Sequence, residues 1–332
     1  MILLQRYLKW VIVMKNIVSN VILGLIAVTG VILGFVFNPG ISETQIETLK
    51  ILGIVCGSAA LSCFVVGEIS RNNSQMDKLW SVLPIVYTWI IAIKGEFNPR
   101  LVVFAILVTL WGIRLTFNFA RKGAYSWKFW AGEEDYRWVV LRQNKLLKNR
   151  FAWMLFNLFF ISIYQNALVL LMCLPSLSCM GSTVPFGAMD YIATSLVVLF
   201  LLIELIADEQ QWKFHETKKK LLKEGKTLEE LPAPYNRGFN TTGLWGHARH
   251  PNYFGEQMIW VSLYLFAIAA GSTQYVLFNW TLCGPMLIIL LFMGSSAFGE
   301  GVSNSKYPEY KIYLQQVSKY IPLWKYNPNK GE

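Results

Sequence analysis

Long apolar runs constrain this chain more than any other feature of its sequence. Eight windows rich in aliphatic and aromatic residues alternate with polar segments, and most approach the ~20 residues that a helix needs to cross a bilayer. They lie at 17–37, 48–69, 79–94, 100–119, 151–174, 187–207, 253–271 and 275–298. Because only helices and closed barrels satisfy their backbone within lipid, the runs predict an all-α, polytopic membrane helix bundle of about eight transmembrane helices.

The composition agrees with a membrane protein and excludes an ordinary soluble domain. Of 332 residues, 54% are hydrophobic and only 15% are charged, and the mean hydropathy is +0.40. A net charge of +10 would suit nucleic acid in a soluble chain, but polytopic proteins gather Lys and Arg in cytoplasmic loops. We therefore expect the lipid bilayer as a partner and no nucleic acid. The five cysteines form no CxxC pair, and we expect them to be small buried hydrophobic residues.

The distribution of Lys and Arg predicts the orientation. On one side of the expected bundle lie three before the first span, two in 70–78, eight in 121–150, eight in 208–252 and five after 299. The opposite side carries only Lys50, Lys94 and Arg100. The positive-inside rule then places both termini in the cytoplasm, in an endoplasmic reticulum membrane or a bacterial inner membrane.

A single integral membrane domain is expected over residues 1–332. Its parts are a cytoplasmic amphipathic segment at 1–16, N-terminal spans at 17–119, a cytoplasmic loop at 120–150, further spans at 151–298 and a cytoplasmic tail at 299–332. The sixth span continues as a basic amphipathic helix to about Lys223. The aromatic tail predicts a short helix that lies on the membrane surface or folds back over the cytoplasmic mouth.

The stretch from Phe239 to Gly271 carries the most chemistry. A Gly- and Thr-rich turn leads through Arg-His-Pro-Asn-Tyr into an apolar helix, and Pro251 suits the first turn of that helix. If the helix begins there, Arg249, Asn252 and Glu256 fall on one face. The alternative is a juxtamembrane cap with a snorkelling arginine.

A second polar stripe leaves the sixth span. Glu204, Asp208, Gln211 and His215 recur at i, i+4, i+7 and i+11, so they share a helix face that runs from the bilayer into the cytoplasm. The alternative is the wet face of a helix that leaves the membrane. With three histidines in the whole chain and no HExxH arrangement, we expect no metal.

The N-terminal half offers candidates for an acid. With helical spacing, Asp77, Trp80, Pro84 and Tyr87 share a face, so a carboxyl and a phenol would look into the same space between helices. The alternative is an aromatic belt at the interface. Tyr164, within the fifth span, is a second candidate for a proton donor, although hydrogen bonding between helices also explains it.

Basic residues of the N-terminal half suit an anionic ligand. Arg114 lies near the cytoplasmic end of the fourth span, where it can snorkel or reach a phosphate. The loop at 121–150 mixes eight basic residues with aromatics, which suits either a shelf for lipid headgroups or the lid of an anionic ligand site.

Several segments together resemble the steroid 5-alpha-reductase superfamily, and in particular its DUF1295 branch. The resemblance begins with NTTGLW at 240–245 and RHPNYFGE at 249–256. It extends to DKLWSVLPIVYTW at 77–89, RKGAYSW at 121–127, EDYRW at 134–138, ADEQQ at 207–211 and KYPEYKIYLQQVSKYIP at 306–322. These segments cover most of the chain beyond the first two spans.

The resemblance implies a membrane reductase that binds NADPH from the cytoplasm and passes a hydride to the β-carbon of a conjugated enone in a lipid-soluble substrate. Basic residues suit the phosphates, while a carboxylate with an amide suits a ribose or a carboxamide. The predicted cofactor residues are Arg114, Asp208, His215, Tyr235, Arg237, Arg249, His250, Asn252, Tyr253, Glu256 and Tyr310.

The chain departs from the steroid reductases at three positions. Ser81-Val82-Leu83-Pro84 stands where they have Gln-Glu before Leu-Pro, Trp111 falls roughly where they have a proton-donating Tyr, and His215 stands roughly where they have an Arg. The acid that polarises the substrate carbonyl is then expected among Tyr87, Asp77 and Tyr164, and the substrate is a steroid-like or another enone lipid.

Two other classes of function remain open. Isoprenylcysteine and phospholipid methyltransferases carry a similar Arg-His-Pro-x-Tyr-x-Gly segment before an apolar helix and use S-adenosylmethionine. A non-catalytic lipid-binding membrane protein could retain the same fold, since fold does not fix function.

Overall fold

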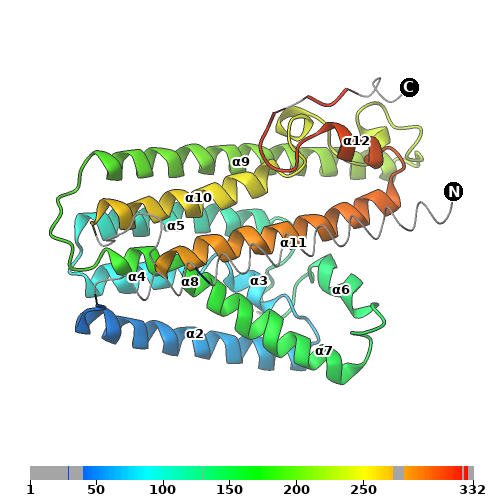
Figure 1. Cartoon of the computed structure of the whole chain (residues 1–332). Coiled ribbons are helices and arrows are strands. Elements are labelled where there is room, and N and C mark those ends of the chain that lie inside the picture. The colour runs from blue at the N-terminus through cyan, green and yellow to red at the C-terminus, as the bar shows by residue number, and fades with distance from the viewer. Residues whose placement is uncertain (1–28, 30–39, 129, 272–279, 324, 328–332) are drawn as a thin grey trace. The chain divides into compact units, whose positions relative to one another are not determined.

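In the computed structural model, residues 29, 40–128, 130–271, 280–323 and 325–327 are described (Figure 1). Within these ranges the chain is helical, and its only extended pairing is a single parallel bridge between Ala248 and Ser318. The expected segment at 1–16 lies outside the described residues, as does the first span at 17–37 apart from Thr29. The prediction of an all-α membrane bundle is confirmed.

The described helices follow one another in this order along the chain. They are α2 (Glu43–Ser70), α3 (Gln75–Leu79), α4 (Leu83–Lys94), α5 (Pro99–Ala120), α6 (Tyr136–Arg142), α7 (Arg150–Phe156), the π-helix η1 (Asn157–Tyr164), α8 (Gln165–Ser178), α9 (Ala188–Lys223), the 3-10 turns η2 (Tyr235–Arg237) and η3 (Gly243–Gly246), α10 (Pro251–Ala269), the 3-10 turn η4 (Trp280–Leu282), α11 (Cys283–Lys306) and α12 (Tyr310–Gln316). Helix α9 ends at Lys223 and α10 begins at Pro251, as the sequence predicts.

Five described helical segments are long and apolar enough to cross a membrane. They are α2, α5, the continuous run at 150–178, α9 and the run at 280–306. The expected span at 79–94 differs, because α4 has only 12 residues and is about 18 Å long. Helix α10, with 19 residues, is about 28 Å long. The count of eight spans stays a prediction.

The break before α4 corrects the expected face at 77–87. Helix α3 ends at Leu79 and α4 starts at Leu83, so Asp77 and Tyr87 do not share one continuous helix. The reason is Pro84, which lies in the first turn of α4. Proline has no N–H to donate and clashes with the preceding turn, so it favours the start of a new helix.

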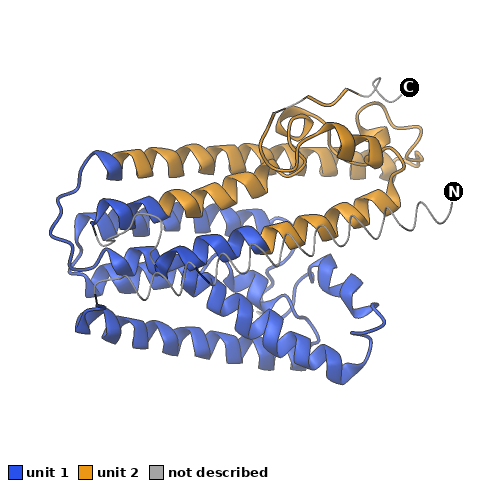
Figure 2. Ribbon diagram, in the orientation of Figure 1, with its two compact units in different colours: residues 1–190, 264–290 blue, residues 191–263, 291–332 orange. Residues whose placement is uncertain are grey.

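The chain divides into two compact units (Figure 2). Unit 1 comprises residues 1–190 and 264–290, and unit 2 comprises residues 191–263 and 291–332. Helices α9, α10 and α11 each contribute to both. The expectation of one membrane domain stays a prediction.

In unit 1, α4 packs against α2, α5 and α8. One end of this unit is fixed by Arg100, which is 1% exposed and forms a bidentate pair with Asp190, Nε to Oδ1 at 2.6 Å and Nη2 to Oδ2 at 2.9 Å. The same guanidinium donates to the carbonyl groups of Val184 and Pro185, at 3.1 Å each. These bonds compensate for the desolvation of both charges and hold the α8–α9 connection in place.

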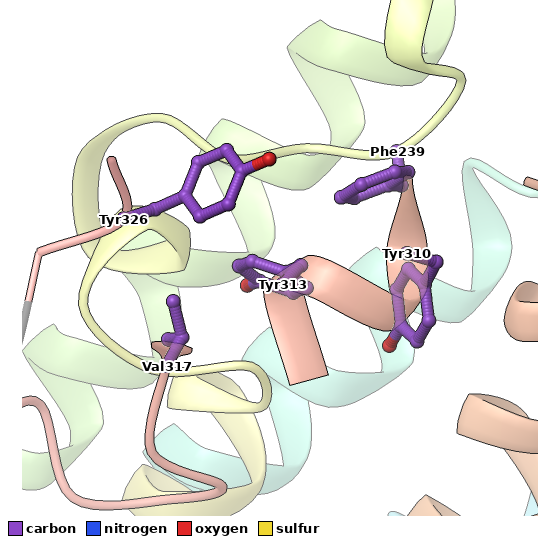
Figure 3. Close-up of a cluster of buried hydrophobic side chains, with 5 residues drawn as sticks. All are labelled: Phe239, Tyr310, Tyr313, Val317 and Tyr326. Carbon is purple, nitrogen blue, oxygen red and sulfur yellow. The ribbon is translucent and has the colours of Figure 1, made fainter. Parts of the chain in front are cut away.

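In unit 2, the C-terminal tail packs back on the segment before α10. Phe239 contacts the rings of Tyr310 and Tyr313, with centroids 4.9 Å and 5.3 Å away, and Tyr326 packs on Tyr313 at 5.4 Å (Figure 3). The Tyr313 hydroxyl donates to the carbonyl of Trp245, and burial raises the pKa of this phenol. The tail therefore belongs to the folded core of this unit.

Candidate functional site

The α9–α10 contact in unit 2 is the centre of the candidate site. A Cβ added at Gly255 would lie 2.8 Å from Glu204 Cβ and 2.9 Å from the Phe200 carbonyl oxygen. Glycine therefore permits the two helices to approach at this point. The approach brings together polar residues that are more than 40 positions apart in the sequence.

Asp208 and Asn252 meet across this contact. The Asn252 side-chain amide Nδ2 donates to Asp208 Oδ1 at 3.1 Å, and Asp208 is 8% exposed. Because a carboxylate oxygen is an acceptor, the amide must turn its nitrogen toward it. The Asn252 carbonyl oxygen is consequently directed elsewhere, and it is buried without a donor among the described residues. The structure thus leaves an acceptor for a hydroxyl or an N–H group beside a carboxylate.

The rest of the α9 stripe follows the expected gradient from buried to exposed. Glu204 is buried, Gln211 is half-buried and His215 is exposed. Gln211 Nε2 and His215 Nε2 lie 3.0 Å apart. On α10, the buried Glu256 accepts a hydrogen bond from Trp260 Nε1 at 3.1 Å. The residues that the sequence places on this face are therefore at one helix pair, and their cofactor roles stay predictions.

Arg249 lies outside this group, which corrects the expected alignment with Asn252 and Glu256. It precedes the first residue of α10, and its guanidinium Nε binds Glu300 Oε1 at 2.7 Å. The same guanidinium donates to the carbonyl groups of Leu314, at 3.1 Å, and Val317. Arg249 thereby connects the start of α10 to α11 and to the tail.

His250 binds the same carboxylate. Its Nε2 is 3.0 Å from Glu300 Oε1, its ring stacks on Tyr253 at 5.2 Å, and Tyr320 lies beside it at 6.2 Å. Burial lowers the pKa of His250, and the positive charges of Arg249 and Lys319 add to this effect against the pull of Glu300. A neutral imidazole at neutral pH is the result.

The remaining candidates of unit 2 lie around the tail. Tyr235 stacks on Phe214 of α9 at 5.2 Å. Arg237 pairs with Glu309 at 3.3 Å, and the Glu309 side chain is 55% exposed. Tyr310 is buried in the aromatic cluster of Figure 3. The Glu309 partner of Arg237 is exposed, so an anionic ligand could replace this ion pair at low cost.

The other four candidates lie in unit 1. Arg114 is buried on α5. Asp77 Oδ2 accepts from Trp138 Nε1 at 2.8 Å, with Arg137 3.6 Å from its other oxygen, and burial raises the pKa of this carboxyl group. Tyr164 is half-buried and stacks on Phe160. The remaining candidate, Tyr87, is fully buried.

The loop at 121–150 is anchored to the segment that contains Asp77. Lys78 Nζ donates to the Ala131 carbonyl at 2.6 Å, and the Tyr125 hydroxyl donates to the Lys78 carbonyl at 2.9 Å. Arg142 binds both Glu134 and Asn73. These bonds hold the loop against the segment that contains Asp77, and the catalytic role expected for Asp77 stays a prediction.

Sequence reasoning missed Glu300, the carboxylate that binds Arg249 and His250. The signal was present, because an acidic residue directly after a long apolar run needs a cationic partner. Within the ranges that the structure describes, no group of three or more His, Cys, Asp or Glu side chains is arranged to hold a metal ion.

The family described as "Protein of unknown function (DUF1295)" matches residues 63–317. The chain belongs to the DUF1295 family. An uncharacterized protein of Schizosaccharomyces pombe is 35% identical over 283 residues, which cover 79% of this chain and 78% of that protein. No solved structure matches. The matched range includes α9, the start of α10 and α12, so the candidate site of unit 2 lies within the part of the chain that defines this family.

Proposed function

We propose that this DUF1295 protein is a membrane-embedded, NADPH-dependent reductase of a carbon–carbon double bond in a lipophilic substrate. The observation that carries the proposal is the Asp208–Asn252 pair of unit 2, in which a buried carbonyl oxygen has no donor among the described side chains. The resemblance of the chain to steroid reductases supports the same reaction class.

The hydrogen-bond acceptors of Asp208 and Asn252 suit a nicotinamide nucleotide. Buried polar groups in folded proteins are nearly always paired, so the Asn252 oxygen needs an O–H or N–H group. A ribose hydroxyl or the carboxamide of nicotinamide provides such a donor, and the neighbouring carboxylate of Asp208 accepts further ones. Arg237, with its exposed partner Glu309, is the cation that suits a phosphate group.

Bound NADPH would supply a hydride to one carbon of the double bond, while a proton reaches the other carbon and NADP⁺ remains. The residues of the chain have simpler tasks. Asp208 and Asn252 bind and orient the polar groups of the nucleotide, and Gly255 keeps α9 and α10 close enough for this pair to form. Arg249 and Glu300 stabilise the polypeptide around the site.

Cofactor titration tests the proposal directly. Purified full-length protein in detergent is titrated in parallel with NADPH and with S-adenosylmethionine by calorimetry. We expect saturable binding of NADPH. Asn252→Ala should lower the affinity about tenfold, because it removes one hydrogen bond between the protein and the nucleotide. Asn304→Ala, which alters an exposed asparagine of the same unit, provides the matched control.

The same titration separates the competing classes. Binding of S-adenosylmethionine without NADPH would replace the reductase with a methyltransferase. Binding of neither molecule would leave a lipid-binding protein of the same fold. Unchanged NADPH affinity in both Asn252→Ala and Asp208→Asn would place the nucleotide elsewhere in the molecule.

A further inference from the structure

Residues 136–151 of unit 1 form a surface, the α6–α7 surface, in which the usual arrangement of polar and apolar side chains is reversed. It comprises α6, the turn that follows and the first residues of α7 (Figure 1). Within α6, Trp138 is buried, and its indole Nε1 donates to Asp77 Oδ2 at 2.8 Å. Arg142, one turn later, pairs with Glu134. The polar contacts of α6 therefore lie on the face that packs against the rest of unit 1.

The opposite face of α6 is apolar. Tyr136, Val139 and Val140 fall at i, i+3 and i+4, so they share a face, and all three are exposed. The turn and α7 continue this pattern, because Leu146 is 82% exposed and Phe151 is 63% exposed. A helix on the surface of a soluble domain turns its apolar face inward and its polar face outward. The reversed arrangement indicates that an apolar medium or partner covers the outer face.

The α6–α7 surface is also strongly basic. Of residues 136–150, five are Lys or Arg and none is Asp or Glu. Two of the five, Arg137 and Arg142, pair with carboxylates that precede α6. The other three are exposed and form no ion pair among the described residues, and they are Lys145, Lys148 and Arg150. Exposed cations interleaved with exposed apolar side chains are typical of segments that lie on an anionic membrane surface.

The place of this surface in the chain sets it beside the bilayer. The continuous helical run that begins at Arg150 has 29 residues and is long and apolar enough to cross a membrane. At 1.5 Å per residue it is about 44 Å long, which matches a bilayer together with its headgroup regions. Its first residue then lies at the level of the headgroups. Asn149 fixes the junction, because its side-chain oxygen accepts from the Phe151 amide at 2.8 Å and caps α7.

The same contacts disfavour a lid over an anionic ligand site, the other function expected for this loop. A lid turns its cations toward the protein, where they contact the enclosed anion. On the inward face of α6, Arg142 already pairs with Glu134 and lies over the Trp153 ring, 4.9 Å from its centroid. The cations that have no carboxylate partner are the exposed ones.

We propose that the α6–α7 surface binds the headgroups of anionic phospholipids in the membrane that the helices of unit 1 cross. The exposed apolar side chains enter the boundary between headgroups and acyl chains, and the three exposed cations bind lipid phosphate and carboxylate groups. Each cation strengthens binding to an anionic surface about fivefold. The inference rests on unit 1 alone and is independent of the nucleotide proposed for unit 2.

A fluorescent label at position 146 tests the contact with lipid. Full-length Leu146→Cys protein is labelled with the fluorophore NBD and reconstituted into vesicles of phosphatidylcholine, with or without phosphatidylserine, that contain lipids with a doxyl quencher near the headgroup. We expect a blue-shifted emission and quenching by the lipid, with both effects larger when phosphatidylserine is present. Thr227→Cys, at an exposed residue beyond the end of α9, is the control and should show neither. Wild-type protein treated in parallel corrects for the five native cysteines.

Replacement of the three exposed cations tests the role of charge. In Leu146→Cys protein that also carries Lys145→Gln, Lys148→Gln and Arg150→Gln, three contributions of about fivefold are lost, or roughly a hundredfold together. The dependence on phosphatidylserine should therefore disappear. Because these side chains are exposed and form no ion pair among the described residues, the unfolding temperature in lipid-free detergent should not change. The matched control removes the same charge from exposed residues of α9, namely Lys219→Gln, Lys220→Gln and Lys223→Gln.

Three outcomes would overturn the inference. In the first, the label at position 146 stays in water in both kinds of vesicle. In the second, its quenching is the same with and without phosphatidylserine, or the dependence persists in the triple Gln variant. In the third, the label responds to inorganic phosphate in detergent and not to lipid, as a lid would. None of these readouts involves NADPH, so failure here leaves the cofactor titration unaffected, and the reverse also holds.

Discussion

Arg249 and Asn252 lie three residues apart, yet the polar groups around Arg249 are paired with one another, whereas the side-chain oxygen of Asn252 has no hydrogen-bond donor among the described residues. Around Arg249, the guanidinium binds Glu300 and two tail carbonyl groups, and His250 binds the same carboxylate. Around Asn252, one hydrogen bond to Asp208 leaves the amide oxygen unpaired among the described residues. The first region stabilises the fold of unit 2, whereas the second contains a hydrogen-bond acceptor that a ligand can use.

The comparison teaches how to distinguish structural from functional polar residues in this chain. Unit 1 contains a second compensated pair, in which the Arg100 guanidinium binds both carboxylate oxygens of Asp190. Substitution of a compensated polar group should lower the free energy of unfolding, whereas substitution of an unpaired polar group should lower the affinity for a ligand.

The largest effect is expected from Arg249→Ala. The change leaves Glu300 and two carbonyl groups without their cation, and removal of one partner of a buried ion pair costs about 3 kcal/mol. Thermal unfolding in detergent measures the loss. Arg249→Lys, which keeps the charge but not the planar set of donors, should recover part of it. An unchanged unfolding temperature would mean that the tail is held by other contacts.

Gly255→Val should have the next largest effect. The new side chain meets Glu204 and the Phe200 backbone below normal contact distance, and overpacking of this kind costs about 1–3 kcal/mol. Because α9 and α10 must separate, the Asp208–Asn252 bond should lengthen and NADPH affinity should fall. Gly294→Val is the control, since a Cβ at Gly294 meets no described atom within 4 Å. Equal stability losses in both variants would show that the close approach of α9 and α10 at Gly255 is not the cause of the loss.

A smaller effect concerns pH and His250. Its pKa in the folded protein is lowered by burial, below the ordinary value of about 6.5. In acid, the unfolded chain therefore takes up a proton more readily than the folded one, and stability falls as the pH drops from about 7 through the lowered pKa.

Unfolding temperatures between pH 7.5 and pH 5 measure this dependence. His250→Gln can still donate to Glu300 but cannot titrate in this range, so its profile should be flatter than that of the wild-type protein. Identical profiles for the two proteins would assign the dependence to another group.

The smallest effect on stability is expected from Asn252→Ala. It removes one hydrogen bond to Asp208 but also a buried oxygen without a donor, so the two contributions nearly cancel, to within about 0.5 kcal/mol. Differential scanning fluorimetry without cofactor measures this. A loss of stability comparable to that of Arg249→Ala would mean that the polar groups around Asn252 stabilise the fold as much as those around Arg249.

Much of the fold was accessible from local patterns. Long apolar runs marked most of the membrane helices, Pro251 marked the start of α10, and the amphipathic pattern carried α9 to Lys223. The failures also have local causes. The predicted helical face from Asp77 to Tyr87 was wrong because Pro84 lies in the first turn of a new helix, α4. The predicted alignment of Arg249 with Asn252 was wrong because Arg249 lies two residues before the start of α10.

The sequence by itself determined the class of protein, because transfer of apolar side chains into lipid and backbone satisfaction by helices depend only on local composition. It also marked the polar residues that such a bundle must explain. Only the tertiary structure decided which of them are compensated. The partners Arg249–Glu300, Asp77–Trp138 and Asp208–Asn252 are 51, 61 and 44 residues apart. Whether a buried polar atom has a partner depends on packing between helices, which no spacing along one helix records.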